Sequence, residues 1–368
     1  MKIKAKRILF TAHSGLGDTL LYIPALKIIR QMYPDAELVC LVNGIARDLF
    51  ECIDFIDKTV HVFDRPEHEV EELLIKEANG YEDEHGVHPV ADVIVLTHRQ
   101  KSVIKAALKS KSPMVLTFSY LPALYTPRLH FTPHFSRKKQ QEIFCYQKLI
   151  RQLNPPLYDE AFEKADFNDI CLKADEAVRE KIVSELKSRG WDEQKQPHLV
   201  MINPLAVTIT KLGFNFTPEQ WLSMSNELAA RNPDVFFVAS SAFENEIDSS
   251  LLTQSNIINL ASQGDIKGLI ALISLSNLVI SSLTGSAHMA ENMCRDVCGL
   301  CPYFDSLRWR ANGLHQLSMK QAKPSLKPSA YTHLELPEGW KDDEAGWLKK
   351  FQDHCQQAID NMKKAQQK

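Results

Sequence analysis

Residues 8–32 read Ile8-Leu-Phe-Thr11, then Ala-His-Ser-Gly-Leu-Gly-Asp18, then an apolar stripe that ends at Met32, and this order decides the fold. The first run is short and apolar, which is typical of a buried strand. Apolar residues then recur at three-residue spacing at Leu20, Ile23 and Leu26, and they predict a helix over 19–32. A buried strand, a glycine turn and a helix are the opening unit of a parallel α/β sheet.

The same alternation continues along the chain in two series. In the first series, further strands are predicted at 37–42, 92–96 and 114–118. In the second series, strands are predicted at 199–203, 235–239, 277–280 and 297–300. Within the second series, one helix is predicted to start at Thr217-Pro-Glu-Gln220 and another to cover 266–276. Between them, Asn154-Pro-Pro156 breaks the pattern, and the charged residues 159–187 are interpreted as a linker that passes into a helix. The pattern predicts an α/β protein with two doubly wound domains that face a central cleft.

We place the first domain at residues 1–172 and the second at 173–335. Residues 336–368 end in a helix whose apolar stripe, from Trp347 to Met362, must be buried. We expect this helix to pack back on the first domain, with binding to a partner protein as the alternative.

The composition limits the classes of function. A chain of 368 residues suits two domains of about 150 residues each. The net charge of −3 argues against a nucleic-acid-binding protein. We expect a cytoplasmic protein, because neither a signal peptide nor a stretch of 18 apolar residues is found. Cys294, Cys298 and Cys301 lie close together, but buried reduced thiols are favoured over a metal site.

Two groups of residues in the first domain are candidates for chemistry. Asp18 follows the glycine turn at the start of the helix, where it is either a helix cap or a general base. Basic residues follow later strand ends, and together they offer a positive surface for an anionic acceptor; the alternative is a solvated loop. This group consists of His98, Arg99, Arg128, His134 and Arg137.

The second domain carries a candidate phosphate site at Thr284-Gly-Ser-Ala-His288, directly after a predicted strand. Backbone N–H groups at such a helix start bind phosphate oxygens, Gly285 leaves room, and Thr284, Ser286 and His288 add side-chain donors. Lys211 could neutralise a diphosphate. Glu244 could accept hydrogen bonds from a ribose, with Glu246 as a competitor. The alternatives are structural: a strand-to-helix turn capped by Thr284, a solvent-exposed loop lysine at Lys211 and a surface glutamate at Glu244.

These pieces, in this order, resemble glycosyltransferase family 9, the lipopolysaccharide heptosyltransferases. The resemblance is carried by Ile8-Leu-Phe-Thr-Ala-His-Ser-Gly-Leu-Gly-Asp-Thr-Leu-Leu21, Pro24-Ala-Leu-Lys27, Tyr33-Pro-Asp-Ala36, Ile202-Asn-Pro204, Lys211, Phe216-Thr-Pro-Glu-Gln-Trp221, Asn259-Leu-Ala261, Thr284-Gly-Ser-Ala-His-Met-Ala290 and Arg308-Trp309. It implies two Rossmann-like domains of the GT-B type and a metal-independent, inverting transfer of heptose from ADP-heptose to the Kdo-containing lipopolysaccharide core. No cofactor is implied, and contact with the inner membrane would be peripheral.

The resemblance also implies roles for single residues. Asp18 matches the family's catalytic base, Lys211 the lysine near the donor phosphates, and Thr284, Gly285 and His288 the phosphate-binding turn; Glu244 is our match for the acid near the ribose. The chain departs from the family pattern at Leu283, where aspartate is usual, and in the extra residues between Lys211 and Phe216. Two alternatives therefore stay open: transfer of another nucleotide sugar, and a non-catalytic binder of nucleotide sugars. An oxidoreductase is disfavoured because the G-x-G-x-x-G spacing is missing.

Overall fold

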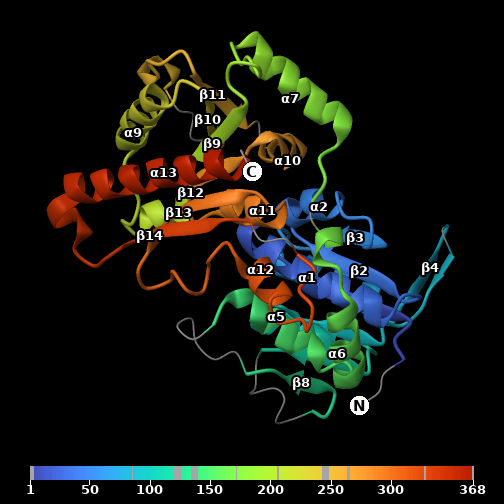
Figure 1. Cartoon of the computed structure of the whole chain (residues 1–368). Helices are drawn as coiled ribbons and strands as arrows, with labels where there is room; N and C mark the ends of the chain where they lie inside the picture. The colour runs from blue at the N-terminus through green and yellow to red at the C-terminus, as the bar shows by residue number, and fades with distance from the viewer. Residues whose placement is uncertain are drawn as a thin grey trace. The chain divides into compact units, whose positions relative to one another are not determined.

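The computed structural model describes residues 4–84, 86–118, 126–133, 140–170, 172–204, 207–242, 248–262, 266–326 and 329–366. Its chain divides into two units (Figure 1). The first unit comprises Met1–Ile170 and Gln316–Leu326, and the second comprises Cys171–His315 and Lys327–Lys368. The chain therefore passes from one unit to the other three times, and residues 316–326 return to the first unit.

The first unit is built on a six-stranded parallel sheet in the order β3-β2-β1-β6-β7-β8. Its strands are β1 (Arg7–Ala12), β2 (Glu37–Val42), β3 (Lys58–His61), β6 (Val93–Val95), β7 (Met114–Thr117) and β8 (Leu129–Phe131). A small antiparallel hairpin, β4 (Tyr81–Asp83) with β5 (Gly86–His88), lies outside this sheet. All six residues of β1 are buried, as expected for a central strand covered on both faces.

In the described part of the chain, four helices of the first unit lie between its strands in sequence, and two more follow the last strand. They are α1 (Leu16–Met32), α2 (Gly44–Phe50), α3 (Glu67–Asn79), α4 (Lys101–Lys109), α5 (Glu142–Arg151) and α6 (Pro155–Lys164). The predicted linker is partly wrong, because residues 155–164 form a helix in which Asn154 accepts a hydrogen bond from the Leu157 N–H. Prolines are compatible with the first turn of a helix, because the N–H groups of that turn make no intrahelical hydrogen bond and none is lost. Pro155 and Pro156 therefore mark the start of a helix and not a linker.

The second unit repeats the first sheet's order of strands, as β11-β10-β9-β12-β13-β14, and all its pairings are parallel. Its strands are β9 (His198–Asn203), β10 (Val235–Ala242), β11 (Ile257–Ser262), β12 (Leu278–Ser282), β13 (Asp296–Pro302) and β14 (Tyr331–Leu336). Its helices are α7 (Glu176–Ser188), α8 (Val207–Lys211), α9 (Pro218–Arg231), α10 (Ile266–Leu275), α11 (Gly285–Asn292), α12 (Gly313–Ser318, at the boundary of the units) and α13 (Glu344–Gln366). The predicted fold class, two parallel-sheet α/β domains, is confirmed.

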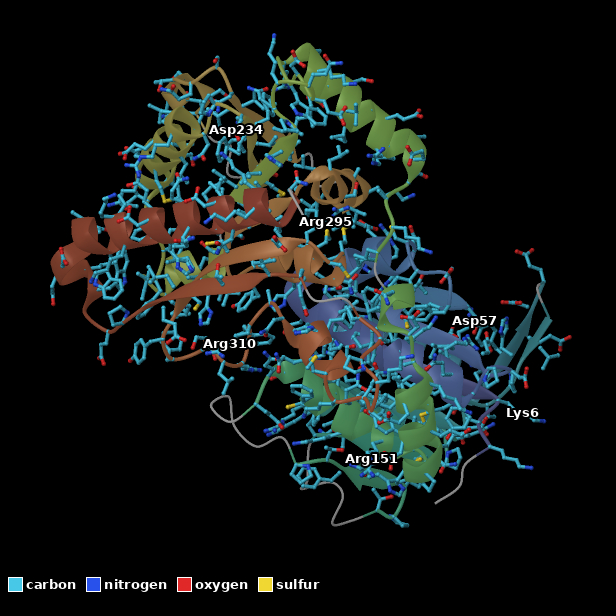
Figure 2. The ribbon with its side chains drawn as sticks, in the orientation of Figure 1. Lys6, Asp57, Arg151, Asp234, Arg295 and Arg310 are labelled. Atoms are coloured by element: carbon cyan, nitrogen blue, oxygen red, sulfur yellow. The ribbon has the colours of Figure 1, made fainter. Side chains whose placement is uncertain are left out.

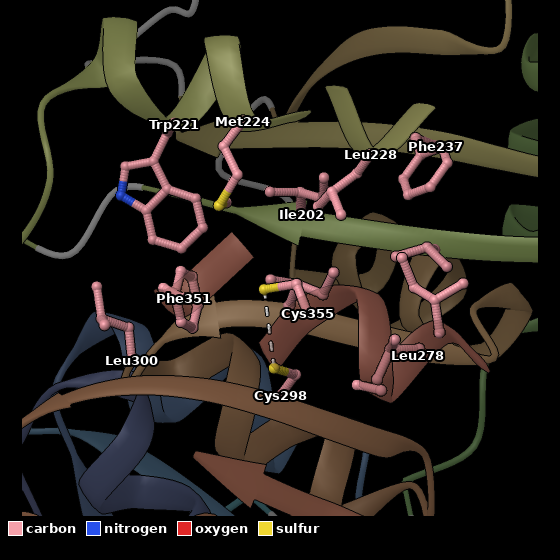
Figure 3. Packing of buried hydrophobic residues seen from close by; sticks show 14 of the residues in the cluster. Ile202, Trp221, Met224, Leu228, Phe237, Leu278, Cys298, Leu300, Phe351 and Cys355 are labelled. Atoms are coloured by element: carbon pink, nitrogen blue, oxygen red, sulfur yellow. Dashed lines mark hydrogen bonds between the residues drawn. The ribbon is translucent and has the colours of Figure 1, made fainter. Parts of the chain in front are cut away.

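The C-terminal helix α13 packs on the second unit. Phe351, Cys355, Ile359 and Met362 belong to one buried apolar cluster with residues of β9, α9, β12 and β13, including Trp221 (Figure 3). The prediction that this helix packs back on the first domain is therefore wrong, because its apolar stripe is already buried within the second. In this core the Sγ atoms of Cys298 and Cys355 lie 3.9 Å apart as free thiols.

The predicted start of the helix at Thr217 and the predicted burial of Cys298 and Cys301 are confirmed. The capping box at the start of α9 is present, with the Thr217 and Gln220 side chains each accepting a hydrogen bond from the other residue's backbone N–H. Cys298 and Cys301 are buried free thiols, whereas Cys294 is half-buried. In the part of the chain that the structure describes, no helix combines the length and the apolar character that crossing a membrane requires.

Candidate functional site

Both sheets have a switch point, where the chain reverses the direction in which it adds strands. In the first unit this point lies between β1 and β6, and in the second it lies between β9 and β12. Ligands of doubly wound sheets bind beyond the carboxyl ends of the strands at such points. Each unit therefore offers one candidate half-site, and the two are described separately.

The half-site of the first unit is built around Ser14 and His98. Ser14 Oγ lies 2.6 Å from His98 Nε2, and His98 Nδ1 lies 2.9 Å from Thr97 Oγ1. The Thr97 hydroxyl donates its proton to the Thr11 carbonyl oxygen at 2.8 Å, so it must accept from His98 Nδ1–H. Consequently Nε2 of His98 carries the lone pair and accepts the Ser14 hydroxyl proton. The strand ends of β1 and β6 thus fix the tautomer of this histidine.

Burial keeps the histidines of this half-site neutral. It lowers the pKa of His98, and nearby Glu142 only partly opposes this shift. Burial, and then the neighbouring His98, lower the pKa of His13 to about 3; its ring stacks on Phe63 with 4.0 Å between centroids. His98 was predicted as part of a positive surface, but it supplies an oriented neutral imidazole instead.

Asp18 lies in the first turn of α1 and is half-buried. The capping residue of this helix is Gly15, so the alternative in which Asp18 is the cap is wrong. Burial raises the pKa values of Tyr22 and Tyr146, and the Asp18 charge adds to the increase at both tyrosines. The helix dipole stabilises a carboxylate at this position.

The other predicted acceptor residues have different fates in the structure. The Arg128 guanidinium donates to the carbonyl oxygens of Leu108, Ser110 and Ser112, at the carboxyl end of α4, at distances between 2.5 and 3.2 Å. These bonds give Arg128 a structural role at a helix terminus. Arg99 is exposed and lies in the segment between β6 and α4. His134 and Arg137 lie outside the described residues.

The half-site of the second unit is the turn between β12 and α11. Thr284 precedes α11 but makes no side-chain capping hydrogen bond, so the alternative of a simple threonine cap is wrong. Its Oγ1 lies 3.1 Å from Ser281 Oγ, and the Asn203 amide donates to Ser286 Oγ at 3.0 Å. The turn is therefore held by side chains from the ends of β9 and β12, while Gly285 begins the helix. Backbone N–H groups at such a helix start are suited to phosphate oxygens.

Two buried polar atoms at this turn lack partners among the described residues. They are Nδ1 of His288, whose side chain belongs to a residue only 4% exposed, and Oδ1 of Asn203. Burial lowers the pKa of His288 to about 4, so its imidazole is neutral at neutral pH. Unpaired buried polar atoms are costly in a folded protein, and a ligand is one way to satisfy them.

Lys211 is the last residue of α8 and is exposed at the carboxyl end of β9. Leu283, which stands where the family usually has aspartate, is only 9% exposed and lies beside Gly299 of β13. It adds no polar group to the turn. Glu244 and its competitor Glu246 lie outside the described residues.

The segment after β13 adds aromatic and cationic side chains at the same edge. The Arg308 guanidinium lies over the Trp309 ring at 4.3 Å, and Arg310 pairs with Glu335 at 3.6 Å. Arg310 is labelled in Figure 2. Elsewhere on the described residues, no group of three or more His, Cys, Asp or Glu side chains is arranged to hold a metal ion.

Sequence-based prediction missed three residues that shape these half-sites: Ser14, Asn203 and Asn215. Ser14 and Asn203 stand directly beyond or at the end of a predicted strand, and this position could have identified them. Asn215 carries no such signal. It lies within the extra residues that follow Lys211, and only the structure shows what its amide contacts.

Comparison with known proteins identifies the second half of the chain. Residues 159–331 match the sequence model of glycosyltransferase family 9 (heptosyltransferase). The match confirms the resemblance drawn from the sequence. A comparison with curated protein sequences finds no match.

Solved structures share the fold at low sequence identity. A family 9 glycosyl transferase from Veillonella parvula has a TM-score of 0.73 at 15% identity, with 98% of both chains covered. The E. coli ADP-heptose lipopolysaccharide heptosyltransferase II has a TM-score of 0.66 at 10% identity, covering 98% of this chain and 100% of its own. E. coli heptosyltransferase WaaC, solved with ADP-2-deoxy-2-fluoro heptose, has a TM-score of 0.55 at 13% identity, covering 81% and 89%.

Proposed function

We propose that this chain, a glycosyltransferase whose residues 159–331 belong to family 9, transfers heptose from ADP-heptose to the inner core of lipopolysaccharide. The observation that carries the proposal is the turn before α11. There, uncapped helix N–H groups, the Ser286 hydroxyl and an unpartnered buried His288 nitrogen meet at one strand end. A diphosphate supplies the acceptor oxygens that such a set of donors lacks.

In this proposal the donor binds to the second unit. The N–H groups of Gly285 and Ser286 and the neutral His288 imidazole hold the diphosphate, and Lys211 offsets the charge that grows on ADP as it leaves. Lys211 is exposed, so its ammonium group can reach a bound diphosphate. Glu244 remains our proposed contact to the ribose.

The acceptor binds to the first unit, where Asp18 is the proposed base. Its carboxylate takes the proton of an acceptor hydroxyl as the oxygen attacks the anomeric carbon from the face opposite ADP, so the configuration inverts. One base suffices for this step, and no metal ion is required in the proposal. Ser14, held by His98, and the exposed Arg99 provide hydrogen-bonding and positive groups for a phosphorylated, Kdo-containing core. The acceptor would bring the protein to the cytoplasmic face of the inner membrane as a peripheral contact.

The test is acceptor-dependent release of ADP from ADP-heptose by the purified protein, with truncated lipopolysaccharide cores as acceptors. Asp18→Asn should lower turnover by about 10²- to 10⁴-fold, the usual contribution of a general base, and leave ADP binding unchanged. Asp35→Asn is the matched control, because Asp35 is an exposed aspartate at the other end of the α1 region. Undiminished turnover by Asp18→Asn would disprove the assigned base.

A second candidate function follows from Leu283. Its apolar side chain packs beside β13 and offers no hydrogen bond to a sugar, which favours another nucleotide sugar or binding without transfer. A panel of ADP-sugars separates these readings. Release of ADP from a different sugar nucleotide would replace heptose in the proposal, and ADP binding without release from any donor would identify a non-catalytic binder.

A further inference from the structure

We propose that Asn215 is a positioning residue for the donor, because its buried amide joins the loop that carries Lys211 to the strand that leads into the phosphate-binding turn. The inference rests on the proposed function, since it assigns Lys211 to the donor phosphates. It concerns residues between Lys211 and Phe216, where the chain departs from the family pattern.

The Asn215 side chain uses all of its main hydrogen-bonding positions. Nδ2 donates to the Pro204 carbonyl oxygen at 2.9 Å and to Thr210 Oγ1 at 3.0 Å. Oδ1 accepts from Trp221 Nε1 at 3.0 Å and from Ser282 Oγ at 2.8 Å. The orientation of the amide is unambiguous, because an indole N–H can only donate and a backbone carbonyl can only accept.

These four partners come from the elements that make up the donor half-site. Pro204 follows β9, Thr210 precedes Lys211 on α8, and Trp221 is a fully buried residue of α9. Ser282 ends β12, two residues before Thr284. One side of the amide therefore holds the lysine loop, and the other holds the rigid core and the phosphate-binding turn.

Most of the lysine loop is exposed, as at Val207, Lys211 and Leu212. It is attached further along the chain, where Trp340 Nε1 donates to the Gly213 carbonyl oxygen at 3.0 Å and the Phe214 ring packs against Phe304. Phe216 then enters the apolar core. Because little of α8 is buried, its position depends on hydrogen bonds. The bonds of Asn215 to Pro204 and Thr210 therefore fix the position of Lys211 relative to Thr284.

The two sides of the amide can be separated by substitution. In Asn215→Asp, a carboxylate oxygen can still accept from Trp221 and Ser282, whereas the donor to Pro204 is lost and two oxygens now face each other there. The core contacts of the residue are kept, whereas the bond that holds the start of the lysine loop at Pro204 is broken. Thr210→Val is a milder variant, since Thr210 is exposed and only one bond of the amide is removed.

The experiment measures ADP and adenosine binding by calorimetry for the whole chain. We expect Asn215→Asp to weaken ADP binding about tenfold, as for the loss of one favourable contact, and to leave adenosine binding within about twofold. We expect Thr210→Val to shift ADP binding in the same direction by less. In a Lys211→Ala background the effect of Asn215→Asp should vanish, because the residue acts through that lysine.

The matched control is Asn256→Asp. Asn256 is also a buried asparagine of the second unit, and its amide donates to the carbonyl oxygens of Ala229, Asn232 and Val235, but it precedes β11 at the amino end of the sheet. It should lower stability without changing the ratio of ADP to adenosine affinity. If Asn215→Asp does not fold, Thr210→Val and the lysine background give the same comparison.

The outcomes distinguish this inference from the function on which it rests. Equal ADP affinity in wild type, Asn215→Asp and Thr210→Val would overturn the inference alone, as would additive effects of Asn215→Asp and Lys211→Ala. Absence of ADP binding by the wild type would overturn the proposed function and the inference with it.

Discussion

His288 and Glu291 lie one turn apart on α11, and burial moves their pKa values in opposite directions. It lowers that of His288 to about 4 and raises that of Glu291 to about 8. Both shifts favour the neutral form, because a charge is penalised in a buried environment. Glu291 also accepts hydrogen bonds from the backbone N–H groups of Leu314 and His315, at 2.6 and 3.2 Å, and so holds the start of α12.

The Glu291 shift predicts a pH-dependent stability. Its folded pKa of about 8 lies above its ordinary value of 4.5, so the folded chain retains a proton that the unfolded chain releases. The contribution is full below pH 4.5 and is lost as pH rises through about 8. Glu291→Gln, which mimics the protonated acid, should reduce the loss of stability from about pH 6.5 to about pH 8, by on the order of 2 kcal/mol.

The measurement is urea unfolding at both ends of this interval. His288 does not contribute there, since its folded pKa is depressed from 6.5 to about 4 and its stabilisation is lost only as pH falls through that range. Glu193→Gln, at an exposed glutamate, is the control and should keep the wild-type slope. Equal slopes in wild type and Glu291→Gln would contradict a shifted Glu291.

At the residue scale, the sequence indicates which residue belongs to a site more readily than it indicates the charge or tautomer of that residue. His98 could be predicted as a site residue because it follows a strand end, but its charge could not. Its neutrality depends on burial, and its tautomer depends on a hydrogen bond from Thr97 to Thr11 across two strands. Arg128 illustrates the reverse case. It was predicted to bind an anion, but its guanidinium donates hydrogen bonds to carbonyl oxygens at the end of α4, such as that of Ser110.

At the element scale, the central strands could be predicted and the edge strands could not. The eight strands predicted from apolar runs are the four inner strands of each sheet, whereas β3, β8, β11 and β14, which were missed, are the four edges. Inner strands of parallel sheets are covered on both faces and read as continuous apolar runs. Edge strands carry polar residues, as in Lys58-Thr-Val-His61, and lose that signal.

The C-terminal helix allows a prediction at this scale. Its stripe was predicted, but amphipathic spacing indicates only that a face is buried and not what covers it. Phe351 is fully buried and contacts Trp221 and Phe216, with 5.4 and 6.0 Å between ring centroids. Phe351→Ala should lower the free energy of unfolding by about 3–5 kcal/mol, the cost of a large cavity.

Urea unfolding followed by tryptophan fluorescence measures this loss, because Trp221 lies in the same core. Lys349→Ala, two residues earlier on the exposed face, should change stability by no more than about 0.5 kcal/mol. A Phe351→Ala variant as stable as the Lys349→Ala variant would mean that α13 does not hold the second unit together.

At the scale of the whole molecule, the proposed function assigns separate tasks to two sheets of identical strand order. Each unit has its own apolar core, and the residues assigned to the donor all belong to the second unit, whereas Asp18, Ser14 and His98 belong to the first. The pattern of alternating strands and helices was enough to predict that the chain forms two parallel-sheet α/β domains. The chain's return to the first unit over residues 316–326 could not be predicted, because neither an apolar strand pattern nor a proline break marks the start of this segment in the sequence.

This division predicts where ADP acts. Ligand binding stabilises the state that binds it, by about 2.7 kcal/mol at a concentration a hundred times the dissociation constant, and the gain is greatest for the backbone that contacts the ligand. Amide hydrogen exchange with saturating ADP should therefore slow at residues 207–216 and 281–292 of the second unit. Strand β1 and the start of α1, which carry the acceptor residues, should exchange as in the free protein, and adenosine should protect the two donor segments less than ADP does because it lacks the phosphates. Protection that appears first around Asp18 would place the nucleotide in the first unit and reverse the assignment of donor and acceptor, whereas protection confined to segments 207–216 and 281–292 would support the assignment of the donor to the second unit.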